Sequence, residues 1–210
     1  MRVLIQTIAF SCLVQVLEAL RQCTCAELQP CLGKVAGLGM KCVNKCKKNL
    51  AKPGINPDAF GNCISKYSNI MSGAIDCTIK KFPNACSQTP TERIIPTRYT
   101  GGLDLAIANK LTDMLKQKGG LSVNELTPFA DVTGKFTSCL HKCAEHKTGV
   151  CMKKAKCDVE LPSDNVLVDT GITCAKTSGL TNAALSEACN CMVQAGMSRL
   201  APICPKLKIF

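Results

Sequence analysis

The sequence predicts a mainly α-helical fold, a small disulfide-rich helical scaffold, from three observations. The chain has 17 cysteines in 210 residues, which is close to the density typical of disulfide scaffolds in secreted proteins. Hydrophobic residues make up 46% of the chain, but Trp is absent and aromatics are 4%, so we expect a core of aliphatic side chains and cystines. Apolar residues recur at helical spacing in most segments.

The first residues have the pattern of a secretory signal peptide. Met1-Arg2 carries one positive charge, and residues 3–17 form an apolar run that is too short and too polar for a membrane span. We expect a signal peptide over residues 1–19, with Thr24-Cys-Ala26 as a second candidate cleavage site. The protein is then secreted and extracellular, without a stable membrane span.

Secretion implies that the cysteines are oxidised to disulfides. Loss of Cys12 with the signal peptide leaves an even number, and so does further loss of Cys23 and Cys25, so complete pairing is possible either way. The connectivity is left open. The expected disulfide cysteines are Cys23, Cys25, Cys31, Cys42, Cys46, Cys63, Cys77, Cys86, Cys139, Cys143, Cys151, Cys157, Cys174, Cys189, Cys191 and Cys204.

Two Cys-x3-Cys elements indicate helices that are each joined twice to their neighbours. Cys42 and Cys46 are four residues apart, as are Cys139 and Cys143. This spacing places both cysteines of a pair on one helix face, one turn apart. The spacing in the first half of the chain is weakly repeated in the second, so two diverged helical modules and one continuous domain are both compatible with it.

The expected N-terminal cysteine-rich helical module covers residues 20–86. Residues 23–46 predict a short helix, a glycine-containing bend and a second helix. After a loop at 51–57, Asp58 is the expected N-cap of one helix that continues to Met71. A further short helix is expected between Cys77 and Cys86, with its end near Pro83.

Residues 87–102 are the expected linker, because their prolines, threonines and final Gly-Gly leave no helical period. The C-terminal module then covers 103–210 and opens with an amphipathic helix over 103–118. Ser122 and Glu125 form the S-x-x-E pattern of a capping box. Pro128 is expected to break or restart that helix, and a disulfide-linked helix over 135–147 is expected to stop at Gly149.

The rest of the chain predicts shorter elements. Cys151 and Cys157 are expected to hold a short lysine-rich turn, and residues 166–168 favour a helix. Thr181 is the expected cap of a helix that ends at Gly196. The apolar tail after Arg199 contains Cys204 and is expected to dock on the fold.

Lysine accounts for most of the positive charge. Lys and Arg number 26 against 15 Asp and Glu, a net charge of +11. Two clusters overlap or follow the Cys-x3-Cys elements, and Lys52 extends the first. Outside the cell such clusters favour sulfated glycans or other anionic molecules, and no pattern of basic residues with aromatics indicates nucleic acid. The candidate anion-binding residues are Lys41, Lys45, Lys47, Lys48, Lys142, Lys147, Lys153, Lys154 and Lys156.

No motif predicts an enzyme or a cofactor. Asp169-Thr-Gly171 resembles the triplet of aspartic proteases, but that chemistry needs two carboxylates and the chain has no second copy, so we expect a turn or a cap. His141 and His146 lie among cysteines and would suit zinc only if the thiols were reduced. We therefore expect no catalytic residues, no metal site and no cofactor.

The cysteine spacing of the C-terminal part resembles a known group. Phe136-x2-Cys139-Leu-x2-Cys143, Ala188-Cys-Asn-Cys191 and Leu200-x3-Cys204-Pro resemble cysteine-rich secreted proteins of nematodes, in particular the chondroitin proteoglycan 4 domain group. The resemblance implies a matrix or eggshell proteoglycan. However, the Ser-Gly dipeptides at Ser72 and Ser178 lack the acidic neighbours usual for glycan attachment, so binding of glycans fits the charge better than carrying them.

Two alternatives stay open at this point. The Cys-x3-Cys element and the gap between Cys77 and Cys86 are similar to those of insect odorant-binding proteins, which would imply a carrier of a small hydrophobic ligand. A defence-type protease inhibitor would need an exposed lysine in a rigid bridged loop, such as Lys153 between Cys151 and Cys157.

Overall fold

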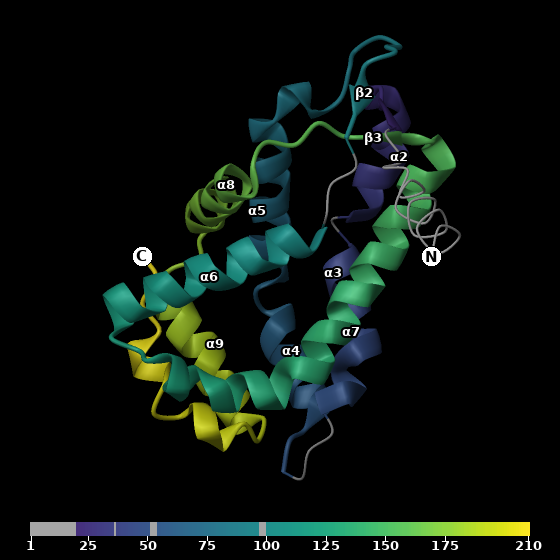
Figure 1. Ribbon diagram of the computed structural model, residues 1–210. Coiled ribbons are helices and arrows are strands. Elements are labelled where there is room, and N and C mark those ends of the chain that lie inside the picture. The colour runs from purple at the N-terminus through teal and green to yellow at the C-terminus, as the bar shows by residue number, and fades with distance from the viewer. Residues whose placement is uncertain (1–19, 36, 51–53, 97–99) are drawn as a thin grey trace, which may run out of the picture.

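The computed structural model describes residues 20–35, 37–50, 54–96 and 100–210, so the expected signal peptide and Lys52 lie outside the described residues. The predicted fold class is confirmed, because α-helices and disulfides dominate the described chain (Figure 1). The α-helices are α2 (Cys25–Val35), α3 (Leu38–Cys46), α4 (Pro57–Ser65), α5 (Ser68–Lys81), α6 (Thr100–Gly119), α7 (Val123–Ala155), α8 (Asp164–Thr177) and α9 (Asn182–Gln194). Short 3-10 helices are η1 (Lys47–Leu50), η2 (Pro83–Ala85), η3 (Ser198–Leu200) and η4 (Cys204–Lys206).

Helix caps predicted from local sequence are largely confirmed. The Ser122 hydroxyl accepts a hydrogen bond from the Glu125 N–H, and the Glu125 carboxylate accepts one from the Ser122 N–H, which completes the capping box of α7. Thr181 caps α9 through the N–H of Ala184. After α9, Gly196 has a φ of 103°, and a Cβ there would overlap the carbonyl of Gly54, so this position requires glycine.

The predicted start of α4 is wrong by two residues. Asn56 is the N-cap, and its side chain accepts hydrogen bonds from the N–H groups of Asp58 and Ala59, both at 3.0 Å. Pro57 follows at the first helical position, where its missing N–H costs nothing. The chain also forms two helices rather than one before Met71, because α4 ends at Ser65 and α5 begins at Ser68.

Two further boundaries differ from the prediction. Cys77 lies inside α5, which ends at Lys81 before Pro83. The predicted break at Pro128 and stop at Gly149 are also wrong, because α7 continues through both positions. Pro128 lies in the second turn of α7, where a proline removes a single backbone hydrogen bond. One glycine costs about 1 kcal/mol, and Gly149 lies between Cys143 and Cys151, whose disulfides hold this part of α7 against α3 and α2.

The expected turn between Cys151 and Cys157 is likewise wrong. Cys151 pairs with Cys31 and Cys157 pairs with Cys23, so no loop is closed between them. Lys153 and Lys154 belong to the last turn of α7, and Lys156 is its C-cap in the left-handed region with φ 50°. The Asp169-Thr-Gly171 triplet lies within α8, not in a turn or cap.

A small sheet lies at one end of α7, near α2 (Figure 1). Its central strand β1 (Leu20–Gln22) pairs antiparallel with β2 (Ile94–Ile95) and parallel with β3 (Cys157–Asp158). The strands are too short to show an alternating pattern, which explains why sequence did not predict them. Part of the expected linker therefore contributes a strand.

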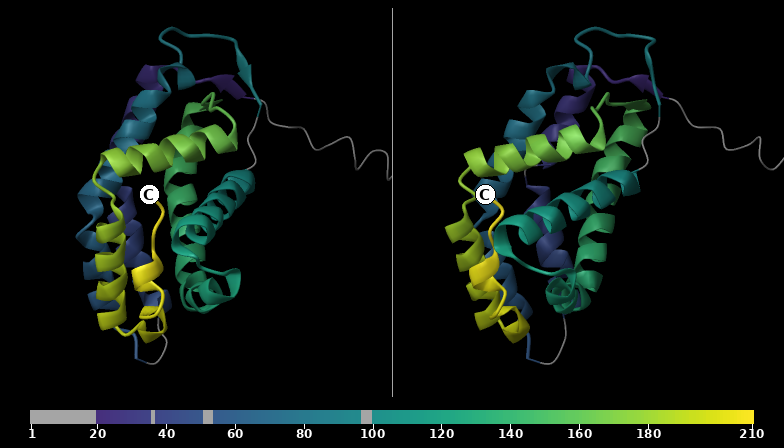
Figure 2. Two further views of the ribbon diagram at one scale, coloured as in Figure 1. Left: turned by 90° about the vertical axis from the view of Figure 1, so that its left-hand side faces the viewer. Right: turned by 60° about the vertical axis from the view of Figure 1, so that its left-hand side comes forward.

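The helices pack in pairs around one main core. α3 and α2 pack on α7, α4 packs on α9, and α8 packs on both α5 and α6 (Figures 1 and 2). In the core the rings of Phe60 and Phe136 meet edge to face, with centroids 5.1 Å apart, and Leu50 and Leu121 are fully buried. The chain end docks on this core as predicted, with Ile203 and Cys204 buried.

All sixteen candidate cysteines form disulfides. Six of the eight bridges join residues 20–86 to residues 103–210, so the two segments are covalently linked, whereas their division into modules stays a prediction. The pairs are Cys23–Cys157, Cys25–Cys86, Cys31–Cys151, Cys42–Cys143, Cys46–Cys139, Cys63–Cys191, Cys77–Cys174 and Cys189–Cys204. Within the described ranges, no helix is both long and apolar enough to span a membrane.

Candidate anion-binding groove

Each Cys-x3-Cys element is the disulfide partner of the other. Cys42 on α3 pairs with Cys143 on α7, and Cys46 pairs with Cys139, with Cα–Cα distances of 5.8 and 5.7 Å. The later cysteine of α3, Cys46, pairs with the earlier cysteine of α7, Cys139, so the two helices run antiparallel. Two bridges one turn apart therefore fix both the separation and the register of α3 and α7.

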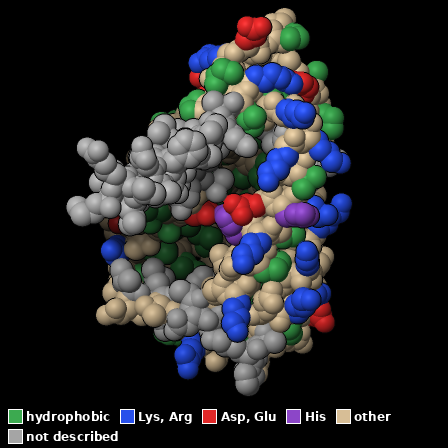
Figure 3. Space-filling view, turned by 45° about the vertical axis from the view of Figure 1, so that its right-hand side comes forward, with side chains coloured by type: hydrophobic (Ala, Val, Ile, Leu, Met, Phe, Trp, Pro, Cys, Tyr) green, Lys and Arg blue, Asp and Glu red, His purple; other side chains and the backbone are tan. Residues whose placement is uncertain are grey.

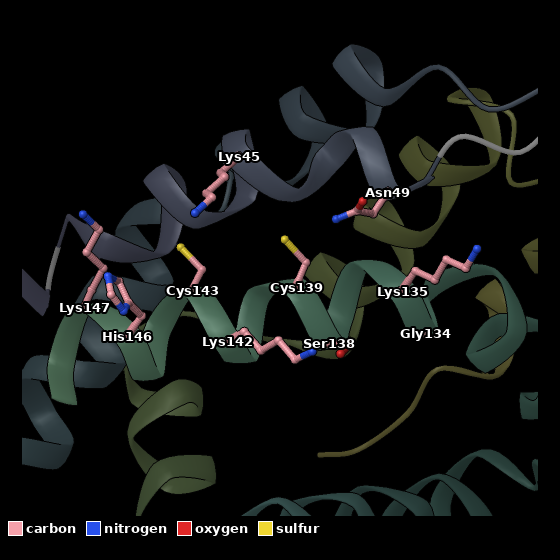
Figure 4. A pocket seen from close by; sticks show the side chains of 10 residues that line it. All are labelled: Lys45, Asn49, Gly134, Lys135, Ser138, Cys139, Lys142, Cys143, His146 and Lys147. Carbon is pink, nitrogen blue, oxygen red and sulfur yellow. The ribbon is translucent and has the colours of Figure 1, made fainter. Parts of the chain in front are cut away.

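A groove of about 730 Å³ lies along this junction. Figure 4 shows Cys139 and Cys143 pointing from α7 toward α3, with Lys45 and Asn49 reaching over from the opposite side. Lysines stand toward both ends of the groove in the same view. The α7 residues that line it are Gly134, Lys135, Ser138, Cys139, Lys142, Cys143, His146 and Lys147.

The groove carries a concentrated positive charge. Among the described residues, four lysines and a histidine line it, and none of the lining residues is Asp or Glu. Ion pairs seen in the described part of the chain involve other lysines, namely Lys47 with Asp58, Lys110 with Asp169 and Lys206 with Glu125. Like charges gathered on one face raise the local potential and attract anions. The exposed lysines of the groove are Lys45, Lys135, Lys142 and Lys147.

The structure unites part of each predicted lysine cluster. Lys45 comes from the first cluster, and Lys142 and Lys147 come from the second. Figure 3 shows Lys and Arg side chains spread over one side of the molecule, with the histidines and a few Asp or Glu side chains among them. The remaining candidates do not line the groove: they are Lys41 on α3, Lys47 and Lys48 on η1, and Lys153, Lys154 and Lys156 at the end of α7.

Sequence reasoning missed Lys135, which belongs to neither cluster. It is seven residues before Lys142, so the two side chains lie two turns apart on nearly the same side of α7. Ser138 and His146 fall near the same stripe. A search for basic residues at helical spacing, rather than for runs in sequence, would have found it.

The two histidines have different surroundings, and in the described part of the chain neither lies beside a free cysteine thiol. Cys139, Cys143 and Cys151 are all in disulfides, so their sulfurs are not thiolate ligands. His141 contacts two carboxylates, with Nε2 2.8 Å from Asp104 Oδ2 on α6 and Nδ1 3.3 Å from Glu145. His146 lines the groove instead. In the described ranges, no group of three or more His, Cys, Asp or Glu side chains is arranged for a metal ion.

Comparisons with protein-family models, with curated proteins and with solved structures find no match for this chain. Its eight disulfides are typical of proteins that mature in an oxidising, extracellular-facing compartment. The function must therefore be inferred from the groove and the scaffold themselves.

Proposed function

We propose that this protein is a secreted, non-enzymatic matrix component that binds sulfated glycans in the groove between α3 and α7. The observation that carries the proposal is the disulfide-fixed junction. It places four exposed lysines around one groove, and the described residues that line this groove include no carboxylate. Like charges gathered on one face repel one another, and binding of an anionic partner relieves that repulsion.

The geometry suits an extended polyanion. Lys135 and Lys147 are twelve residues apart on one helix, which corresponds to about 18 Å along the axis. Sulfate groups repeat along a glycan, so several can meet lysines of the groove at once. Lysine is a compact point charge rather than a bidentate fork, so recognition by charge density is expected instead of recognition of one sulfation pattern.

The packing around Ser178 favours a protein that binds glycans over one that carries a glycan chain. The resemblance to chondroitin proteoglycan 4 proteins implies a carrier, so the proposal differs from it on this point. Ser178 is half-buried and lies against α5. A Cβ added at Gly73 of α5 would be 3.1 Å from the Ser178 hydroxyl oxygen. Ser72 lies in the middle of α5. Transfer of a glycan to Ser178 would require this helix pair to open.

Retention on heparin and chondroitin sulfate columns tests the proposal. The fourfold variant Lys45→Gln, Lys135→Gln, Lys142→Gln and Lys147→Gln should elute at much lower salt than the parent. If each exposed contact contributes about 0.5 kcal/mol, as surface ion pairs do, affinity falls roughly 30-fold. The matched control carries Lys80→Gln, Lys81→Gln, Lys116→Gln and Lys118→Gln, which removes the same charge from exposed positions that do not line the groove.

The control variant should keep nearly all of its retention at physiological salt, where charges further away than about 8 Å are screened. Equal loss in both variants would show that net charge, not the groove, causes retention. Full retention by the groove variant would exclude the groove as the binding site.

A further inference from the structure

Helix α6 covers the fold loosely on its apolar side. No described side chain of α6 is buried, although the helix has 20 residues. Leu103, Ile107, Leu111 and Leu115 follow one another at four-residue steps, which places them along one side of the helix. Beneath this side lie two apolar pockets, one at each end of the stripe.

The larger pocket has a volume of about 310 Å³ and lies between α6, α8 and the chain end. An enclosed apolar cavity of about 150 Å³ can bind benzene. This pocket is larger and partly open to solvent, so it has room for a substantial apolar group that enters from the surface. Figure 2 shows the chain end between α9 and α6, reaching toward α8. The pocket is lined by Leu103, Ile107, Leu111, Leu167, Val168, Gly171, Ile172, Ala175, Leu180, Ile209 and Phe210.

The second pocket, of about 210 Å³, lies one turn further along α6. Leu111 lines the first pocket and Leu115, one turn later, lines the second. On the chain end, Leu207 lines the second pocket and Ile209 lines the first. Two apolar spaces arranged end to end fit a long, narrow occupant better than a compact ring. The remaining lining residues are Leu185, Ala188, Cys189, Met192, Leu200 and Ile203.

Polar contacts hold the pocket walls in place. Lys110 on α6 pairs with Asp169 on α8 at 2.7 Å, which joins the two helices across the pocket. The Asn182 carboxamide oxygen accepts hydrogen bonds from the N–H groups of Ile209 and Phe210 at 3.0 and 3.1 Å, and its nitrogen donates to the Phe210 carbonyl at 2.9 Å. These bonds position the chain end that forms one wall.

One cation stands at the edge of the larger pocket. The Lys176 ammonium lies 5.8 Å from the centroid of the Phe210 ring, and its neighbour Ala175 lines the pocket. No carboxylate in the described residues pairs with Lys176, whereas Lys110 is already paired with Asp169. We propose that the groove beneath α6 binds the hydrocarbon chain of a long-chain fatty acid, with its carboxylate at Lys176.

Gly171 provides a precise test of this site. It lines the larger pocket, and a Cβ added there would meet nothing within 4 Å. Gly171→Leu therefore adds an apolar side chain at the pocket wall, starting from a Cβ that has open space around it, and it replaces a helix-breaking residue with a helix-favouring one. Gly149→Leu is the matched control, because Gly149 lies within α7, lines neither pocket and also has nothing within 4 Å.

The experiment measures binding of a naturally fluorescent polyene fatty acid and its displacement by unlabelled long-chain fatty acids. The parent protein should bind saturably, Gly171→Leu should bind at least tenfold more weakly, and Gly149→Leu should bind like the parent. Thermal unfolding checks that both variants are folded. Absence of saturable binding to the parent, or equal binding by Gly171→Leu, would overturn the proposal.

Two further arms test the head group and the independence of the site. Lys176→Gln should weaken displacement by the fatty acid but not by the corresponding fatty alcohol; equal effects on both would overturn the assignment of an acid. The fourfold lysine-groove variant should bind the fluorescent fatty acid unchanged. This site does not depend on the proposed glycan groove, so either proposal can fail while the other holds.

Discussion

The cysteine-free stretch at residues 87–138 and the cysteine-rich parts on either side of it are held in different ways. Covalent bridges fix α3 against α7 and α5 against α8. The cysteine-free stretch relies on short strand pairing, on burial of a few side chains such as Leu121, and on ion pairs. Those ion pairs are Arg93 with Glu160, His141 with Asp104, Lys110 with Asp169, and Glu125 with Lys206.

The difference shows what disulfides permit. Where α3 and α7 are bridged, the surface carries lysines for which no ion pair is seen within the described residues, and the covalent bonds resist the repulsion between these lysines. Where α6 has no bridge, opposite charges hold it to its neighbours and its apolar side stays loosely covered. The charged groove is therefore crossed by two disulfides, whereas the α6 wall of the apolar pockets is held by ion pairs and partly buried side chains.

Removal of the bridges between α3 and α7 should have the largest effect. Replacing Cys42, Cys143, Cys46 and Cys139 with Ser opens both bridges, whose sequence separations are 101 and 93 residues. Loss of one native bridge typically costs about 2–5 kcal/mol, so denaturant unfolding should show a larger loss for both. Heparin retention should fall as well, because the groove is no longer held together.

The control for this variant removes the Cys25–Cys86 bridge, which lies away from the groove. It should lower the free energy of unfolding and leave heparin retention of the folded protein unchanged. If the variant without the α3–α7 bridges still elutes at the parental salt concentration, then the disulfides do not form the site.

Acid should have an intermediate effect and should act partly on the cysteine-free stretch. The Lys206 ammonium, with the Ser122 N–H and hydroxyl, lowers the pKa of Glu125 from 4.5 to about 2. Its stabilising contribution is therefore complete above the unfolded-state pKa of 4.5 and is lost as pH falls toward 2. Glu125→Gln should be less stable than the parent at neutral pH and should show a smaller decrease in stability over this range.

Glu27 provides the matching acid-sensitive group in the bridged part of the fold. Arg21, followed by the Thr24 N–H and hydroxyl, lowers its pKa to about 2 as well. Glu27→Gln should therefore also reduce the decrease in the free energy of unfolding between pH 4.5 and pH 2, independently of Glu125→Gln. The free energy of unfolding of the double variant with Glu27→Gln and Glu125→Gln is measured by chemical unfolding from pH 7 to pH 2. If it depends on pH as in the parent, other carboxyl groups dominate the acid sensitivity.

The smallest effect should come from the ion pair between α6 and α8. Lys110→Gln or Asp169→Asn removes a half-exposed pair, which is worth about 0.2–1 kcal/mol. A double-mutant cycle at low salt measures this coupling, and the coupling should shrink when salt screens the charges. Coupling that is large and independent of salt would mean that α6 is held as firmly as the bridged helices.

Several features could be predicted because they depend on neighbours in sequence. Ser122 with Glu125 and Thr181 cap helices through residues three positions away. The helix expected over 103–118 forms within α6, since its apolar spacing is a local pattern. Local patterns failed where distant packing intervened: α7 passes Gly149 because bridges from Cys143 and Cys151 on either side hold it against α3 and α2.

The sequence by itself determined a helical, disulfide-rich scaffold with an excess of lysine, because composition and short-range spacing are properties of the chain alone. Only the tertiary structure decided that Cys42 pairs with Cys143 and Cys46 with Cys139. Pairing depends on which helices pack together, and an even set of cysteines allows many solutions. That packing brings Lys45, Lys135 and Lys147 around one groove, where distance in space rather than position in the sequence governs their shared potential.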